Sequence, residues 1–148
     1  MSSKLADCVP KYCDDRKECV AIEKGKKYKL INDSRHVIKS IKLDECLADK
    51  IGERICDYLM HIDNKELKRA IFVELKGGDL NSALKQLYST VTYLKSEFTN
   101  HKMDARIVSS RDVPNIASTP DYRKLAREII PTGGNIDRGT NNIYTEKC

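Results

Sequence analysis

The sequence predicts an α/β domain in which a mixed central β-sheet is flanked by helices. Three observations predict this class. Short runs in the first half alternate apolar and polar side chains, two later runs are joined by a polar turn, and a long run then places apolar residues at helical spacing. Strands interleaved with helices favour a sheet that helices cover. With 148 residues, the chain is long enough for one domain with a sizeable core.

The chain divides into three predicted segments within that single domain. Residues 1–37 form a basic N-terminal arm, residues 38–111 hold the core, and residues 112–148 form a C-terminal helix followed by a mobile tail. In the first two segments, the runs KYKLI and VIKSIKL alternate well enough to be strands. We therefore expect the sheet to begin before residue 45.

A β-hairpin is the clearest predicted unit. The runs Arg54 to Ile62 and Arg69 to Lys76 are rich in β-branched and long apolar residues, and the polar stretch DNKELK lies between them. A turn centred in that stretch places Asp57 opposite Glu74 on the same face of the sheet. Lys76, two residues after Glu74, shares that face. A slip of one residue in register would turn Asp57 away.

A long helix and a further strand follow the hairpin. Asp79 is a suitable N-cap for a helix that runs to about Phe98, with its apolar residues on one stripe and Gln86 beside that stripe. The run from Asp104 to Arg111 predicts another strand, and a short helix is expected from Asp121. This order of elements completes the mixed sheet.

The basic residues are concentrated near the N-terminus. The net charge is +5, and its surplus lies in the first 40 residues, where the densest run is EKGKKYKL. Four lysines flank a tyrosine there, which fits either a polyanion-binding surface or a solvated hairpin. These lysines are Lys24, Lys26, Lys27 and Lys29.

Composition also bounds the location and the thiol chemistry. No run of about 18 apolar residues and no signal peptide is present, so we expect a soluble cytoplasmic protein without a membrane partner. Six cysteines are too few for a disulfide scaffold, which favours reduced thiols. The spacing of Cys8, Cys13 and Cys19 matches no zinc knuckle. The three histidines, His36, His61 and His101, are each expected at the surface.

The carboxylates of the hairpin carry the candidate chemistry. Two carboxylates on adjacent strands repel one another unless a cation lies between them. Carboxylate oxygens, with water and phosphate in the other positions, are typical of a magnesium site. Lys76 on the same face could then orient an attacking water or stabilise charge on phosphorus.

Here the motifs resemble a known superfamily. Asp57 in RICDYL, Glu74-Leu75-Lys76 in FVELKGGD and Gln86 in the following helix together are similar to the Asp…Glu-x-Lys signature of the PD-(D/E)XK, restriction-endonuclease-like nucleases. The resemblance covers approximately residues 38–111. It implies a restriction-endonuclease-like core and a metal-dependent nuclease that hydrolyses phosphodiester bonds, with DNA as the expected substrate.

The resemblance also implies roles for particular residues. Asp57, Glu74 and the backbone carbonyl of Leu75 would bind Mg²⁺ or Mn²⁺, and Lys76 would be the catalytic lysine. Gln86 would lie beside the site, although the tyrosine expected four residues later is Thr90 here. Glu18 and Glu23 are candidates for a further glutamate. Candidates to hold the nucleic-acid backbone are the four lysines above with Gln86, Arg106 and Arg111.

Several alternatives stay open at this stage. Asp57, Glu74 and Lys76 could instead be a cross-strand ion-pair cluster, and Asp63 in the turn could replace Asp57 as the acidic partner. The domain could bind nucleic acid or a protein without cutting. A small domain of this kind needs a second copy to cut both strands, so the analogy also implies a homodimer.

Overall fold

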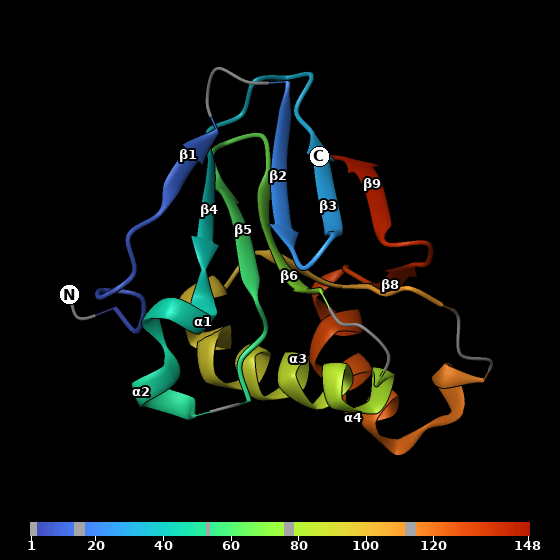
Figure 1. Cartoon of the computed structure of the whole chain (residues 1–148). Helices are drawn as coiled ribbons and strands as arrows, with labels where there is room; N and C mark the ends of the chain where they lie inside the picture. Colours follow the sequence, from blue (N-terminus) through green and yellow to red (C-terminus); the bar gives the residue numbers. More distant parts are fainter. Residues whose placement is uncertain (1–2, 14–16, 53, 76–78, 112–114) are drawn as a thin grey trace.

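The computed structural model describes residues 3–13, 17–52, 54–75, 79–111 and 115–148, and it shows an α/β fold in three layers (Figure 1). A six-stranded sheet lies in the middle, helices cover one face of it, and a three-stranded sheet covers the other. The α/β class and the mixed central sheet are therefore confirmed.

The six-stranded sheet is mixed, in the order β1-β4-β5-β6-β7-β8. Its first four strands pair antiparallel, and β6, β7 and β8 pair parallel. The strands are β1 (Lys11–Cys13), β4 (Ile38–Lys42), β5 (Tyr58–Asp63), β6 (Lys68–Leu75), β7 (Lys102–Val108) and β8 (Ile136–Gly139).

The hairpin register is as the sequence predicts. Leu59 lies opposite Phe72, and Tyr58 lies opposite Val73. The turn fixes this register because Asn64 closes it, with its side-chain oxygen accepting from the backbone N–H groups of Glu66 and Leu67. Continuing the register by one residue brings Asp57, just before β5, beside Glu74.

Helices pack on one face of the central sheet. The long helix α3 (Leu80–Leu94) continues as the 3₁₀ turn η1 (Lys95–Phe98), and its apolar residues are buried, as the predicted stripe requires. The buried residues are Leu80, Ala83, Leu84, Leu87, Thr90, Val91, Leu94 and Phe98. Asp79 is its N-cap, with Oδ1 accepting from the Ser82 N–H at 3.0 Å, as predicted. The other helical elements are α1 (Leu43–Cys46), α2 (Ala48–Ile51), η2 (Ile116–Ser118), α4 (Pro120–Ile129) and η3 (Ile130–Thr132).

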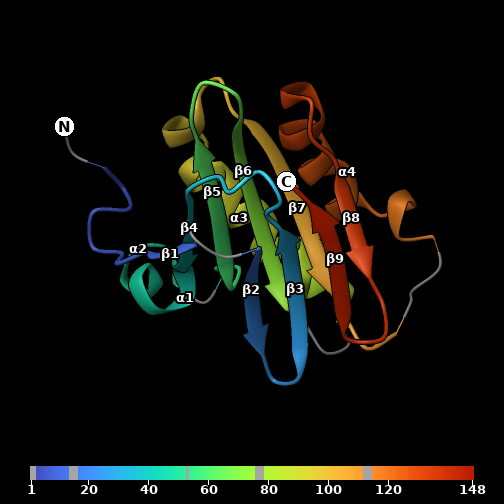
Figure 2. The same cartoon turned by 90° about the horizontal axis from the view of Figure 1, so that it is seen from above.

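The second sheet joins the two ends of the chain. It contains β2 (Glu18–Glu23), β3 (Lys26–Ile31) and β9 (Ile143–Lys147), with β9 parallel to β3. Figure 2 shows this sheet lying over the central one. The prediction of a mobile tail is therefore wrong. The N-terminal segment is likewise no separate arm, because it supplies one strand to the central sheet and two to the second.

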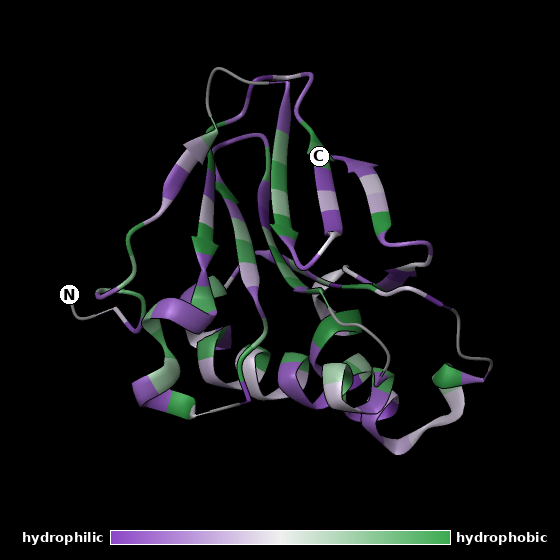
Figure 3. Cartoon of the chain, in the orientation of Figure 1, coloured by the Kyte–Doolittle hydropathy of each residue, from purple (hydrophilic) through white to green (hydrophobic). Residues whose placement is uncertain are grey.

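The core has two parts, one on each side of the central sheet. In β2 and β3, buried residues alternate with more exposed ones, and Figure 3 shows hydrophobic residues in the strands of both sheets and in the helices. Leu59 and Phe72 point toward the helices, whereas Met60 and Ile71 point toward the second sheet. None of the helices that the structure describes is long and apolar enough to cross a membrane.

The cysteines contradict the expectation of reduced thiols. Cys8 is bonded to Cys46, and Cys13 is bonded to Cys19. All six cysteines lie in the described residues, and of these Cys56, which is buried, and Cys148 are free. The pairings could not be inferred from sequence because they depend on β1 returning beside β4, and on the N-terminal turn packing against α1.

Candidate functional site

Four carboxylates meet at one edge of the central sheet. Glu74 is near the end of β6, Asp57 directly precedes the antiparallel strand β5, and Asp44 is in α1, directly after β4. Glu23 ends β2 of the second sheet. Strand ends of both sheets therefore bring together acidic residues that are far apart in the sequence.

Each of the two predicted carboxylates accepts a hydrogen bond from a backbone N–H at or next to the other residue. The N–H of Asp57 donates to Oε1 of Glu74 at 3.1 Å, and the N–H of Leu75 donates to Oδ2 of Asp57 at 2.8 Å. Glu74 is buried and Asp57 half-buried. The residues thus lie side by side, and each fixes the other's position.

Glu23 and Asp44 complete a cluster with Asp57. One carboxylate oxygen from each of the three residues lies within 4.8 Å of the others. Oε2 of Glu23 and Oδ1 of Asp44 are buried, and neither has a hydrogen-bond partner among the described residues. Burying an acceptor without a partner costs free energy, so these oxygens mark a place where a ligand would stabilise the protein.

Local structure explains how Glu23 reaches this cluster. Lys24 and Gly25 form a two-residue turn with positive φ values of 50° and 79°, as in a type I′ hairpin. Glu23 therefore ends its strand beside the turn, and the hydroxyl of Tyr58 donates to the carbonyl of Ile22 at 3.3 Å. This contact holds the end of β2 against the start of β5.

The acidic side chains have pKa values above their ordinary range. Burial raises the pKa of Asp57, and the charge of Asp44 raises it further. Burial also raises the pKa of Glu23, and the nearby Asp57 adds to this. The pKa of Asp44 is raised by burial and by Glu23. Each shift has the sign expected of carboxylates crowded together away from water.

Helix α3 supports the site from below the sheet. In the orientation that satisfies its neighbours, the amide nitrogen of Gln86 donates to Oε2 of Glu74 at 3.0 Å and to the carbonyl of Ser82 at 3.2 Å. Thr90, one turn later, accepts from the N–H of Cys56 at 2.9 Å. Gln86 thus positions Glu74, and Thr90 positions Cys56, the residue before Asp57.

A cavity of about 410 Å³ adjoins the carboxylates. Asp44, Asp57 and Gln86 line it together with Ile55 and two residues of the α2 region. The cavity gives a substrate access to the side of the cluster that faces the helices.

Several predicted site residues have other positions. Lys76 lies outside the described residues. Arg106 is buried, with Nε donating to Oε2 of Glu146 at 2.7 Å, so the prediction that it holds nucleic acid is wrong. Glu18 is at the far end of β2 from Glu23. Asp63 is at the far end of β5 from Asp57, so it does not replace Asp57.

The basic candidates that remain near the site belong to the β2–β3 hairpin. Lys24 is in its turn, and its charge partly offsets the rise in the pKa of Glu23. Lys26, Lys27 and Lys29 follow in β3, where Lys27 is exposed. Arg111 is exposed just after β7.

Sequence reasoning missed Asp44. Its signal was its place directly after an alternating run, because the end of β4 lies at the same sheet edge as the start of the antiparallel β5. The histidines were also misplaced: His101 is buried and His61 half-buried, and their Nε2 atoms are 3.0 Å apart. His61, Asp63 and His101 form a second cluster at the opposite end of β5.

Comparisons with known proteins add no assignment. Protein-family models, curated proteins and solved structures all gave no match to this chain. The function must therefore be argued from the site itself.

Proposed function

We propose that the protein is a metal-dependent nuclease that hydrolyses phosphodiester bonds, with DNA as its substrate. The observation that carries this proposal is the cluster of Glu23, Asp44 and Asp57, whose oxygens approach within 4.8 Å beside Glu74. The resemblance of Asp57, Glu74 and Lys76 to the PD-(D/E)XK signature supports the same conclusion. The restriction-endonuclease-like core belongs to this proposal as well.

The donor set fits Mg²⁺ or Mn²⁺. Both are hard cations that prefer oxygen ligands, and the described part of the cluster offers carboxylate oxygens without histidine or thiolate. Asp57, Glu74 and the carbonyl of Leu75 would hold the ion, with Glu23 and Asp44 close enough to bind it or its water. A bound ion would polarise the scissile phosphate and lower the pKa of a water molecule.

The remaining roles belong to the chain's own side chains. Lys76, by its resemblance to the catalytic lysine, orients the attacking water or stabilises charge on phosphorus. Lys24, Lys26, Lys27 and Lys29 on the hairpin beside the carboxylates hold the phosphate backbone, as Arg111 does from the end of β7. Gln86 keeps Glu74 in place. A homodimer would allow both strands to be cut.

The compartment is a separate question from the chemistry. The cytoplasmic location stays a prediction, and the two disulfides bear against it because such bonds persist in oxidising surroundings. Measuring the fraction of oxidised cysteines in protein taken directly from its host would decide this point.

The test is a cleavage assay on supercoiled plasmid and linear DNA, with RNA as a parallel substrate. Each substrate is incubated with Mg²⁺, with Mn²⁺ or with chelator. We expect cleavage of DNA only with the divalent cation. Asp57→Asn, Glu74→Gln and Lys76→Ala should each lower the rate by roughly 100-fold or more, because a ligand or a charge-stabilising group is lost.

A matched control separates chemistry from general damage. Glu128 is a glutamate of α4 that pairs with Lys95 at the surface, far from the carboxylates in the sequence and on another element. Glu128→Gln should cleave at the wild-type rate. DNA binding that persists in all variants, with no cleavage under any condition, would contradict the nuclease and leave a binding module of the same fold.

A further inference from the structure

The cluster at the other end of β5 has a different donor set. His61 and Asp63 are in β5, and His101 directly precedes β7. The two Nε2 atoms are 3.0 Å apart, and Oδ2 of Asp63 is 3.9 Å from Nε2 of His101. Two imidazoles and one carboxylate converging in this way are typical ligands of Zn²⁺.

We propose that His61, His101 and Asp63 form a second metal site, which binds a transition-metal ion of the Zn²⁺ type. Imidazole nitrogen favours Zn²⁺, Ni²⁺ and Cu²⁺ over Mg²⁺, which favours oxygen. This site therefore differs in selectivity from the carboxylate cluster. It does not depend on the nuclease proposal.

The orientation of His101 leaves its Nε2 atom available to bind a metal ion. Nδ1 of His101 is 3.1 Å from the carbonyl oxygen of Thr99. A carbonyl only accepts, so Nδ1 carries the proton, and Nε2 of the neutral ring presents a lone pair toward His61. Metal-binding histidines commonly donate their other N–H to a backbone carbonyl in this way.

Packing holds both rings in place. Phe98 lies edge-on to His61, with ring centroids 4.9 Å apart, and edge-on to His101, at 5.5 Å. A tetrahedral Zn²⁺ with bonds of about 2.0–2.1 Å requires its two nitrogens to be about 3.3 Å apart. The observed 3.0 Å needs only a small opening. Because Nε2 of His101 accepts in this pair, Nε2 of His61 carries the proton between the rings, and this proton must move to Nδ1 of His61 when an ion binds.

His61 is neutral at pH 7, which is the form that binds metal. Burial lowers the pKa of His61 to about 4. The hydrogen bond from Lys68 lowers the pKa of Asp63 below its ordinary value of 3.8. Lys68 contacts Oδ1 of Asp63, so Oδ2, which faces His101, is the oxygen left for the ion.

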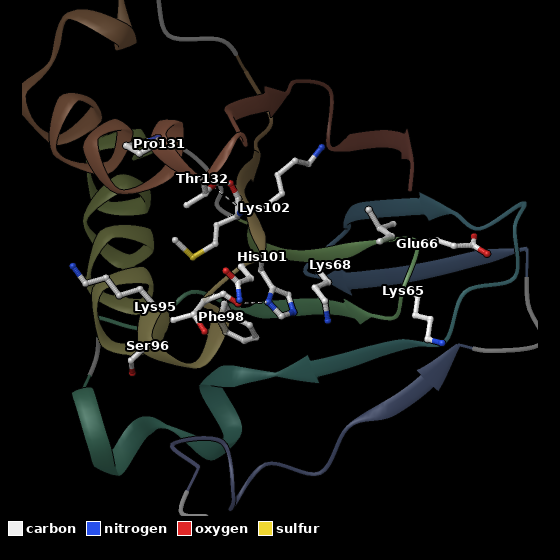
Figure 4. Close-up of a pocket in the computed structure, with 14 residues that line it drawn as sticks. Lys65, Glu66, Lys68, Lys95, Ser96, Phe98, His101, Lys102, Pro131 and Thr132 are labelled. Carbon is white, nitrogen blue, oxygen red and sulfur yellow. Dashed lines mark hydrogen bonds between the residues drawn. The ribbon is translucent and has the colours of Figure 1, made fainter.

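The cluster is accessible from two sides. His101 lines a cavity of about 920 Å³, which Figure 4 shows with Lys68, Lys95 and Lys102 around it. His61 lines a second cavity of about 370 Å³. An ion can reach the rings through either opening, and three protein ligands leave a position for water or an anion.

The experiment is a titration of chelator-treated protein with Zn²⁺, followed by calorimetry. Visible absorption with Co²⁺ gives a second readout of the coordination geometry. An Asp57→Asn/Cys148→Ser background removes a carboxylate ligand and the partly exposed thiol that could bind metal. We expect one tight site in this background. His61→Gln and His101→Gln should each weaken its affinity by roughly 100-fold.

Two comparisons make the outcome decisive. His36→Gln changes the third histidine, whose Nδ1 is 3.0 Å from Nδ2 of Asn64, and it should leave the affinity unchanged. Asp63→Asn changes an exposed ligand without disturbing the core, and it should weaken the affinity for Zn²⁺. Imidazole ¹⁵N shifts of the unaltered protein should move at Nε2 of both His61 and His101 on adding Zn²⁺. Unchanged Nε2 shifts, or equal affinity in the His61→Gln/His101→Gln variant, would overturn the proposal.

Discussion

Replacing Glu146 with alanine should strongly destabilise the protein, because Glu146 joins the two sheets. It is in β9, and its carboxylate accepts from Tyr28 in β3 at 2.7 Å. It also accepts from Arg106 in β7 at 2.7 and 3.1 Å, and from Arg69 in β6 at 3.1 Å. The side chains of Arg69 and Arg106 are only 4% and 3% exposed. Removing Glu146 therefore leaves a buried excess of positive charge.

The size of the effect follows from that burial. Removing one partner of a buried ion pair lowers the free energy of unfolding by about 3–5 kcal/mol, partly because the remaining charge stays out of water. Asp104 still faces both guanidinium groups, with distances of 2.7 Å to Arg69 and 3.5 Å to Arg106, which favours the lower end. For a chain of this size, a loss of 3 kcal/mol lowers Tm by about 10 °C.

The assay is thermal and urea unfolding at pH 7, with the disulfides kept intact. Glu128→Ala is the matched control, since Glu128 pairs at the surface with Lys95, whose side chain is 55% exposed. Exposed pairs contribute about 0–1 kcal/mol. A Glu146→Ala variant no less stable than Glu128→Ala would refute the assignment of Glu146 as the link between the sheets.

The pH dependence gives an independent check. Burial alone would raise the pKa of Glu146, but hydrogen bonds from Arg106 and Tyr28 hold it below the ordinary value of 4.5. A carboxylate with a lowered folded-state pKa stabilises the protein above its unfolded pKa and loses this contribution as pH falls through the folded value. The difference in the free energy of unfolding between wild type and Glu146→Gln should be largest at pH 6–7, and it should decrease below about pH 4.5.

Three further changes test the supports of the site. Thr90→Val leaves the buried N–H of Cys56 without its acceptor, so it should cost about 1–3 kcal/mol in urea unfolding, whereas Thr90→Ser should retain most of that stability. Asp79→Ala removes the N-cap of α3 and should cost about 1 kcal/mol, with Asp79→Ser restoring it; equal stability of both would contradict the cap. Cys8→Ser/Cys46→Ser opens a link between residues 38 apart and should lower the free energy of unfolding by about 4 kcal/mol, and reductant should then have little further effect at this link.

The sequence predicts the local parts of this fold and misses the long-range ones. The hairpin register and the Asp79 cap follow from neighbouring residues, so both could be read in advance. The pairing of β9 with β3 joins segments more than 100 residues apart. The short polar run that forms β9 does not indicate in the sequence that β3 is its partner. That missed pairing is why Arg106 was assigned to nucleic acid, although Glu146 covers it.

The candidate site divides in the same way. Asp57 and Glu74 come from one hairpin, whose turn determines that they are neighbours. Glu23 arrives from the second sheet and Asp44 from the end of β4, so their proximity depends on how separate elements pack. A pattern of residue types along the chain does not contain that packing.

Two sets of half-buried carboxylates in this protein have opposite charge balances. Around Glu146, the two guanidinium groups more than offset burial, and the pKa of the carboxyl group is lowered. Around Glu23, Asp44 and Asp57, the nearby Lys24 and Lys42 do not offset it, and each pKa is raised. The first set is neutralised by the chain itself. At the second set, the described residues gather acidic oxygens without supplying enough positive charge, which is the arrangement that a divalent cation would complete.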